Sequence, residues 1–228
     1  RLEFSMFRFD RRSALIAGVL SAAALLVSAC TGGGAPASAE GEMSLGSPDA
    51  PVTVVEYASV TCPHCAAWTE DVFPEFKARY IDTGQVRFVF RELPTPPVPV
   101  AVAGFLTARC IAGDDQELYF TTLDAMMRGQ QAMVADPRGF LLNMARSAGM
   151  NEAAFDACVS DEAAIAAMNE RVADAQTLGV TGTPYFLIND QRHEDISLEG
   201  FEAALRPLIG GAAPAPATPA ATDSAPPE

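Results

Sequence analysis

The chain has 228 residues, of which 49% are apolar and 19% charged, a composition typical of a folded globular protein rather than a disordered one. Its length allows one ordinary domain, or one domain that carries an insertion, around a hydrophobic core. The formal net charge of −14 argues against nucleic-acid binding, which requires a basic surface.

The first 29 residues have the pattern of an export signal. A short basic stretch over residues 6–12 precedes the apolar run 14–27, which is shorter than the roughly 20 residues of a membrane-spanning helix. Small residues and then Cys30 follow that run. We therefore predict a secretory signal peptide over residues 1–29.

Residues 27–30, Val-Ser-Ala-Cys, resemble a bacterial lipobox, in which the cysteine is lipidated and becomes the new N-terminus. This predicts a lipid anchor on Cys30 as the chain's sole contact with the membrane, with ordinary cleavage after Ala29 as the alternative. The stretch that follows, residues 30–45, is rich in Gly, Ala, Ser and Pro and predicts a flexible tether.

The first half of the folded part reads as strand, helix, strand. The β-branched run 52–57 predicts a buried strand, and residues 86–90 predict a second one. Between them, apolar side chains recur at helical spacing over residues 66–80. Thr61 is expected to cap this helix, and Pro74 to kink or split it.

The second half predicts a helical block followed by one strand and one helix. After the Pro-rich residues 94–99, the Ala-rich segment 100–178 is mostly helical in pattern. A strand is expected at 185–188, a turn at 189–190 and a helix from Ser197. This order predicts an α/β domain that is split by an all-helical insertion.

Cys62-Pro63-His64-Cys65 is the motif with the clearest chemistry. Two cysteines three positions apart at a helix start lie within disulfide reach. Unpaired backbone N–H groups and the helix dipole stabilise a thiolate on Cys62, and His64 adds positive charge. A stable thiolate favours the reduced pair, so its disulfide is a strong oxidant. We expect Cys62 to be the exposed nucleophile and Cys65 the buried resolving thiol.

A zinc site and an inert disulfide are the alternatives to a redox pair. Zinc needs four ligands, and the sequence has no second closely spaced pair of cysteines or histidines. We therefore expect no metal and no cofactor. His193 is expected in a surface loop.

Two separated motifs resemble the DsbA-like thiol:disulfide interchange proteins of the thioredoxin superfamily. Residues 56–65 are similar to the active-site segment of the oxidising members, and residues 180–188 to the cis-proline loop and the strand after it. The resemblance covers 46–209 and implies a thioredoxin fold with an inserted all-helical domain. Within that range it implies the first part of the thioredoxin fold (46–96), the helical insertion (97–172) and the second part of the fold (173–209). Sequence pattern and composition predict the remaining segments, a signal peptide (1–29), a tether (30–45) and a disordered Ala/Pro tail (210–228).

The resemblance also implies a substrate-binding loop. Pro184 would be a cis proline facing Cys62, which exposes the backbone of Thr183 for pairing with a substrate strand, while a trans proline opening a strand is the alternative. Pro63 would contact substrate as well. Thr183 stands where the best-known oxidases have valine and is closer to isomerase-like relatives, so both activities stay open.

One further residue receives a role by the same resemblance, and two cysteines receive one by elimination. Glu56 resembles the family's buried acid and would exchange a proton as Cys65 changes state, and a solvent-facing glutamate on an edge strand is the alternative. If Cys30 is lipidated and Cys62 and Cys65 form the redox pair, Cys110 and Cys158 are the two cysteines left over. In an oxidising compartment, such a pair suggests a structural disulfide. Two buried free thiols are the alternative.

The sequence thus predicts a periplasmic protein disulfide oxidoreductase, a dithiol oxidase anchored through lipidated Cys30. Its partners would be unfolded or reduced secreted proteins and, by resemblance, a membrane quinone reductase of the DsbB type that reoxidises it. The alternatives are a disulfide isomerase or reductase of the same fold, and a non-enzymatic chaperone or metallochaperone.

Overall fold

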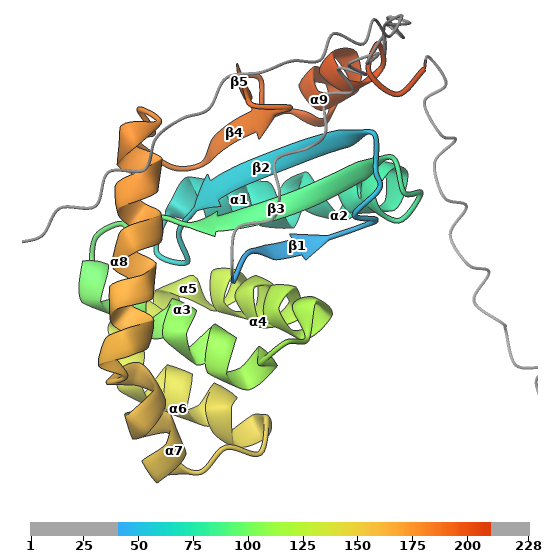
Figure 1. Cartoon of the computed structure of the whole chain (residues 1–228). Coiled ribbons are helices and arrows are strands. Elements are labelled where there is room, and N and C mark those ends of the chain that lie inside the picture. Colours follow the sequence, from blue (N-terminus) through green and yellow to red (C-terminus); the bar gives the residue numbers. More distant parts are fainter. Residues whose placement is uncertain (1–40, 211–228) are drawn as a thin grey trace, which may run out of the picture. The chain divides into compact units, whose positions relative to one another are not determined.

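The computed structural model describes residues 41–210, so the predicted signal peptide, the lipidation site and nearly all of the tail lie outside the described residues. A five-stranded mixed sheet of order β1-β3-β2-β4-β5 forms its centre (Figure 1). The central strands β2 and β3 are parallel, and the other neighbours are antiparallel. The strands are β1 (Met43–Leu45), β2 (Val52–Ala58), β3 (Val86–Glu92), β4 (Tyr185–Ile188) and β5 (Gln191–His193).

The helices confirm the predicted α/β fold with an all-helical insertion. Two helices and a π-helical turn connect β2 to β3: α1 (Pro63–Asp71), α2 (Phe73–Phe76) and η1 (Lys77–Ile81). The insertion contains α3 (Val98–Ala112), α4 (Gln116–Arg128), α5 (Gln130–Ala135), α6 (Pro137–Ser147), α7 (Glu152–Val159) and α8 (Glu162–Thr177), and α9 (Leu198–Leu205) follows the last strand. The helix after β2 is split just before Pro74, as expected from the missing backbone donor of proline.

Both faces of the sheet are covered. On one face, Trp68 of α1 packs against the rings of Phe88 and Phe186 from the sheet and Phe201 from α9. On the other face, the last turns of α8 contribute Ala175 to a smaller apolar cluster with strand residues. Helix α8 also runs along the insertion (Figure 1) and crosses the boundary expected at residue 172, because one continuous helix serves both parts.

The prediction of a flexible tether over residues 30–45 is wrong at its C-terminal end. Residues Met43–Leu45 form β1, which pairs antiparallel with β3 and buries Met43 and Leu45. Glu42 beside them forms ion pairs with two arginines of β3. Three residues are too few to give a periodic signal, so sequence pattern could not detect a strand that its neighbours stabilise.

His193 is not in a surface loop, as the sequence suggested, but in β5. It pairs with Phe186 across the β4–β5 hairpin, and its ring lies 4.7 Å from that of Phe201, measured between centroids. The hairpin turns at Asn189 and Asp190, which adopt positive φ angles of 46° and 64°. Those angles suit Asn and Asp, and they return the chain along β4 as an added edge strand.

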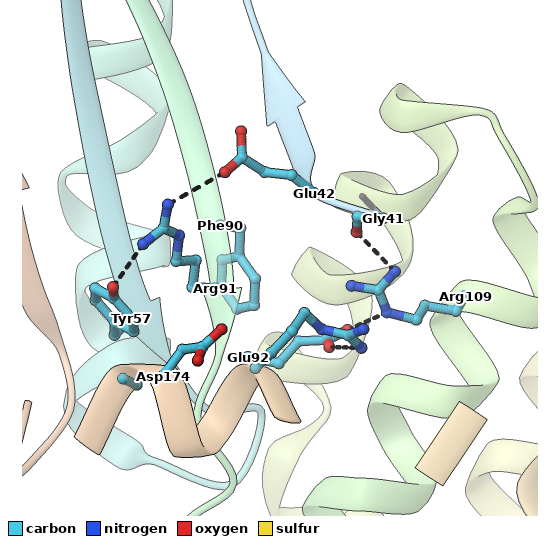
Figure 2. Close-up of a pocket in the computed structure, with 10 residues that line it drawn as sticks. Gly41, Glu42, Tyr57, Phe90, Arg91, Glu92, Arg109 and Asp174 are labelled. Carbon is cyan, nitrogen blue, oxygen red and sulfur yellow. Dashed lines mark hydrogen bonds and ion pairs between the residues drawn. The ribbon is translucent and has the colours of Figure 1, made fainter. Parts of the chain in front are cut away.

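Glu92, at the end of β3, joins the sheet to the insertion (Figure 2). Its fully buried carboxylate accepts hydrogen bonds from Arg109 of α3 at 2.6 Å and Arg171 of α8 at 2.8 Å. The hydroxyl of Tyr119 in α4 donates a third at 2.8 Å. A cavity of about 120 Å³ lies beside this cluster. A buried carboxylate is costly unless it is paired, so the cluster fixes three insertion helices to one strand end.

A disulfide between Cys110 and Cys158 links α3 to α7 inside the insertion. The two Cα atoms lie 6.3 Å apart, and the cysteines are 48 positions apart in sequence. Closing so long a loop restricts the unfolded chain much more than the folded one.

We expect Cys110→Ala/Cys158→Ala to lower the free energy of unfolding by about 2–4 kcal/mol, because the unfolded chain regains the entropy of that loop. Urea denaturation of the oxidised protein measures the change. An unchanged midpoint would show that the bridge does not stabilise the fold.

Candidate active site

Cys62 occupies the N-cap of α1. Its Sγ accepts a hydrogen bond of 3.3 Å from the backbone N–H of Cys65, and Pro63 takes the first helical position. The prediction that Thr61 caps this helix is therefore wrong. Because Pro63 fixes the first turn, the cap falls one residue later, and the Thr61 hydroxyl donates instead to the carbonyl of Thr95 at 2.8 Å.

The two thiols have opposite electrostatic environments. The pKa of Cys62 falls to about 5, chiefly because the Cys65 thiol donates a hydrogen bond to it, with further hydrogen bonds from Thr183 and from the backbone of Cys65 and His64. Burial raises the pKa of Cys65 far above its usual range, and the hydrogen bond to Cys62 raises it further. One thiolate on Cys62 and one proton on Cys65 is therefore the favoured state of the reduced pair.

Exposure distinguishes the two sulfurs less than expected. Cys65 is fully buried as predicted, whereas Cys62 keeps 6% of its surface instead of being plainly exposed. The loop before β4 lies against it, and the distance from Cys62 Sγ to the carbonyl oxygen of Thr183 is 3.5 Å. The peptide bond between Thr183 and Pro184 is cis. The structure thus brings the motif of α1 and the distant loop together in one site.

His64 and Pro63 lie exposed in the first turn of α1, on the open side of the site. His64 reaches Cys62 through its backbone N–H, which helps to lower the pKa of that thiol. That the charge of its imidazole also stabilises the thiolate stays a prediction. The exposed side chain of His64 beside Cys62 is placed to contact a molecule that approaches this sulfur.

Glu56 lies in the sheet beneath the cysteine pair. Strand β2 runs between β3 and β4, so Glu56 faces Phe90 on one side and Phe186 on the other, and the edge-strand alternative does not hold. Its side chain is buried, and burial raises its pKa well above the usual range, with a smaller contribution from the charge of Cys62. The negative charge of Glu56 in turn raises the pKa of Cys65, which places the two groups within electrostatic reach.

Gln130 is a site residue that sequence reasoning missed. From α5 of the insertion, its side-chain amide donates to the carbonyls of Val60 at 2.9 Å and Cys62 at 3.1 Å. These bonds hold the loop that carries Cys62, although Gln130 and Cys62 lie 68 positions apart in the sequence. Nothing in the local sequence of α5 signals such a contact.

Other candidate chemistry is not brought together in the part of the chain that the structure describes. Over residues 41–210, no group of three or more His, Cys, Asp or Glu side chains is placed to hold a metal ion. In the same range, no helix is both long and apolar enough to cross a membrane. Cys110 and Cys158 are bonded to each other and lie in the insertion.

The low pKa of Cys62 leads to a titration experiment. In the reduced protein, we expect the ultraviolet absorbance of one thiolate to appear with a midpoint near pH 5, and Cys62→Ser to remove it. Because an unfolded cysteine titrates at about 8.5, the thiolate stabilises the folded reduced protein fully above that pH. This stabilisation is lost as pH falls toward 5. A midpoint near the ordinary cysteine value would contradict the geometry described above.

A family model described as Thioredoxin matches residues 38–206 of the chain. The chain belongs to the thioredoxin family. This thioredoxin-family protein is DsbA-like, because it is similar to Wolbachia pipientis alpha-DsbA1, whose crystal structure it matches with a TM-score of 0.68 and 27% identity. That match covers 76% of this chain and 93% of the other.

Two rickettsial relatives carry the provisional name protein-disulfide oxidoreductase. The protein from Rickettsia bellii is 29% identical over 174 residues, and the protein from Rickettsia conorii is 31% identical over 172 residues. These matches cover 75% and 73% of this thioredoxin-family chain. The chain spans 65% and 60% of the length of these curated relatives.

Proposed function

We propose that the chain is an exported thiol:disulfide oxidoreductase that introduces disulfides into secreted proteins through Cys62 and Cys65. The observation that carries this proposal is the hydrogen-bonded Cys62 sulfur at the helix start, whose pKa of about 5 lies far below that of its partner. A stabilised thiolate favours the reduced pair over the disulfide. The oxidised protein is then a donor of disulfides rather than a sink for them.

Disulfide transfer begins when a substrate thiolate attacks Cys62 Sγ. A sulfur–sulfur bond forms between substrate and Cys62, the Cys62–Cys65 bond breaks, and Cys65 leaves as a thiolate that takes a proton from Glu56. A second substrate thiolate then attacks the substrate sulfur of the mixed disulfide and releases Cys62 as the stable thiolate. The substrate loses two electrons, and the cysteine pair gains them.

The substrate chain pairs with the backbone of Thr183 during this exchange. The Thr183 carbonyl lies 3.5 Å from Cys62 Sγ, so a strand hydrogen-bonded there presents its own cysteine to the nucleophile. Pro63 and His64, exposed on the facing helix turn, complete the contact.

Reoxidation requires an electron acceptor, for which we propose a membrane quinone reductase of the DsbB type. The proposed compartment is the periplasm, with membrane attachment through lipidated Cys30. The N-terminal sequence pattern and the names of the relatives support this part of the proposal.

The test is the redox equilibrium of Cys62 and Cys65 in glutathione buffers, with thiols tagged and counted by mass so that Cys110 and Cys158 are scored separately. We expect the active pair to stay reduced until the buffer is strongly oxidising. A pair that stays oxidised in strongly reducing buffer would overturn the oxidase assignment in favour of a reductase or isomerase, the activity that Thr183 suggests.

A further inference from the structure

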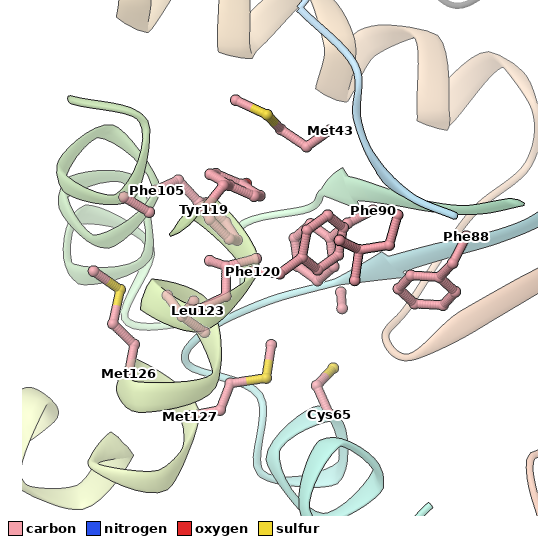
Figure 3. Packing of buried hydrophobic residues seen from close by; sticks show 14 of the residues in the cluster. Met43, Cys65, Phe88, Phe90, Phe105, Tyr119, Phe120, Leu123, Met126 and Met127 are labelled. Carbon is pink, nitrogen blue, oxygen red and sulfur yellow. The ribbon is translucent and has the colours of Figure 1, made fainter. Parts of the chain in front are cut away.

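The buried carboxyl of Glu56 borders a small cavity between the sheet, α1 and α4. Its Oε1 atom has no hydrogen-bond partner within residues 41–210. The cavity measures about 20 Å³, and most of its wall is apolar. Figure 3 shows part of this wall, with Cys65 nearby. The labelled wall residues are Phe88, Phe90, Phe120, Leu123 and Met127.

Two further polar side chains reach this cavity. Thr69 of α1 donates its hydroxyl hydrogen to Met127 Sδ at 2.9 Å, which leaves the lone pairs of Oγ1 able to accept. Asp124 of α4 is 38% exposed, and its Oδ2 accepts a hydrogen bond from Arg128 Nε at 2.8 Å. Every other lining residue is apolar, so Asp124 is the lining side chain that is both polar and exposed to solvent.

The cavity has the size and the partners that one water molecule needs. About 10–15 Å³ of probe-occupied volume holds a water, provided that two to four polar groups bind it. Glu56 Oε1, Thr69 Oγ1 and the carboxyl of Asp124 supply that number. A buried carboxyl oxygen left without such a partner destabilises the folded protein.

We propose that this cavity holds a single water that carries protons between Glu56 and solvent, with Thr69 and Asp124 as its positioning residues. The role rests on the proposed function. After Cys65 leaves as a thiolate and takes the proton of Glu56, the Glu56 carboxylate regains one from the water. The water takes its replacement from solvent at Asp124. One proton enters for each disulfide donated, and no electrons move along this route.

Infrared spectroscopy tests the route without any substrate. The carboxylic acid C=O band that Glu56→Gln removes from the spectrum belongs to Glu56. After rapid mixing into D₂O, this band shifts as its proton exchanges for deuterium. We expect Asp124→Asn and Thr69→Val each to slow that exchange by about 10²-fold, the lower end of what a positioned proton-transfer group contributes.

Two controls separate proton transfer from charge and folding. Asp124→Glu is expected to restore the wild-type exchange rate. Asp71→Asn removes the same charge from the exposed end of α1, outside the cavity wall, and is expected to leave the rate unchanged. Asp124→Asn changes a surface group, so the test does not depend on whether Thr69→Val folds.

The proposal is overturned if the exchange rate is the same in Asp124→Asn as in the wild-type protein, or if Glu56→Gln removes no such band. If the Cys62–Cys65 pair stays oxidised in reducing glutathione while Asp124→Asn slows deuterium exchange at Glu56, the oxidase function is overturned and the proton route stands. If the protein donates disulfides normally while Asp124→Asn leaves deuterium exchange at Glu56 unaltered, the proton route is overturned and the oxidase function stands.

Discussion

Cys62→Ser is expected to abolish disulfide exchange completely, whereas Cys65→Ser is expected to accumulate mixed disulfides with substrate. Of the two free cysteines in residues 41–210, Cys62 is the one that keeps any exposed surface, and its pKa of about 5 makes it a thiolate at neutral pH. A serine hydroxyl neither forms the disulfide nor ionises in this range. Without Cys65, the Cys62 thiolate still attacks a disulfide in the substrate and forms a mixed disulfide with it, but the thiol that would release Cys62 from that mixed disulfide is gone.

Non-reducing electrophoresis of each variant with an unfolded substrate protein that carries disulfides measures both effects. The matched control is Cys110→Ala/Cys158→Ala, which removes two sulfurs from the insertion and is expected to exchange at the wild-type rate. Wild-type activity in Cys62→Ser, or a Cys65→Ser protein that never forms an adduct, would show that the attacking sulfur has been assigned to the wrong residue.

The parts of this site that local sequence could predict are those fixed by neighbours along the chain. Cys62 and Cys65 lie within one helical turn, so their spacing alone brings the sulfurs together. Glu56 could be placed only by resemblance, because its burial depends on β2 having strands on both sides.

The rest depends on contacts between segments that are remote in sequence. Gln130 reaches the Cys62 carbonyl from a helix of ordinary composition, and the loop at Thr183 covers the nucleophile more closely than its helix-end position suggests. The strand β1 exists because β3 offers it a partner and because two apolar side chains find a core. Helical and strand periodicities carry no information about such pairings.

Glu92→Ala is expected to lower the free energy of unfolding by about 3–5 kcal/mol, the usual cost of leaving a buried charge without its partner. The carboxylate is fully buried, and Arg109 and Arg171 both depend on it for their ion pairs. Tyr119 loses the acceptor of its hydroxyl as well. Because these residues come from α3, α8 and α4, the loss falls where the insertion meets the sheet. Urea denaturation measures the change.

Two comparison variants decide what the Glu92 cluster contributes. Glu117→Ala removes an exposed carboxylate from α4 and is expected to change stability by less than about 0.5 kcal/mol. Glu92→Leu combined with Arg109→Met, Arg171→Met and Tyr119→Phe is expected to recover most of the loss, because a buried polar cluster replaced whole by apolar groups is often neutral. If this fourfold variant were as unstable as Glu92→Ala, the polar cluster would stabilise the fold outright. Recovery would mean that the cluster chiefly fixes how the insertion helices meet the sheet.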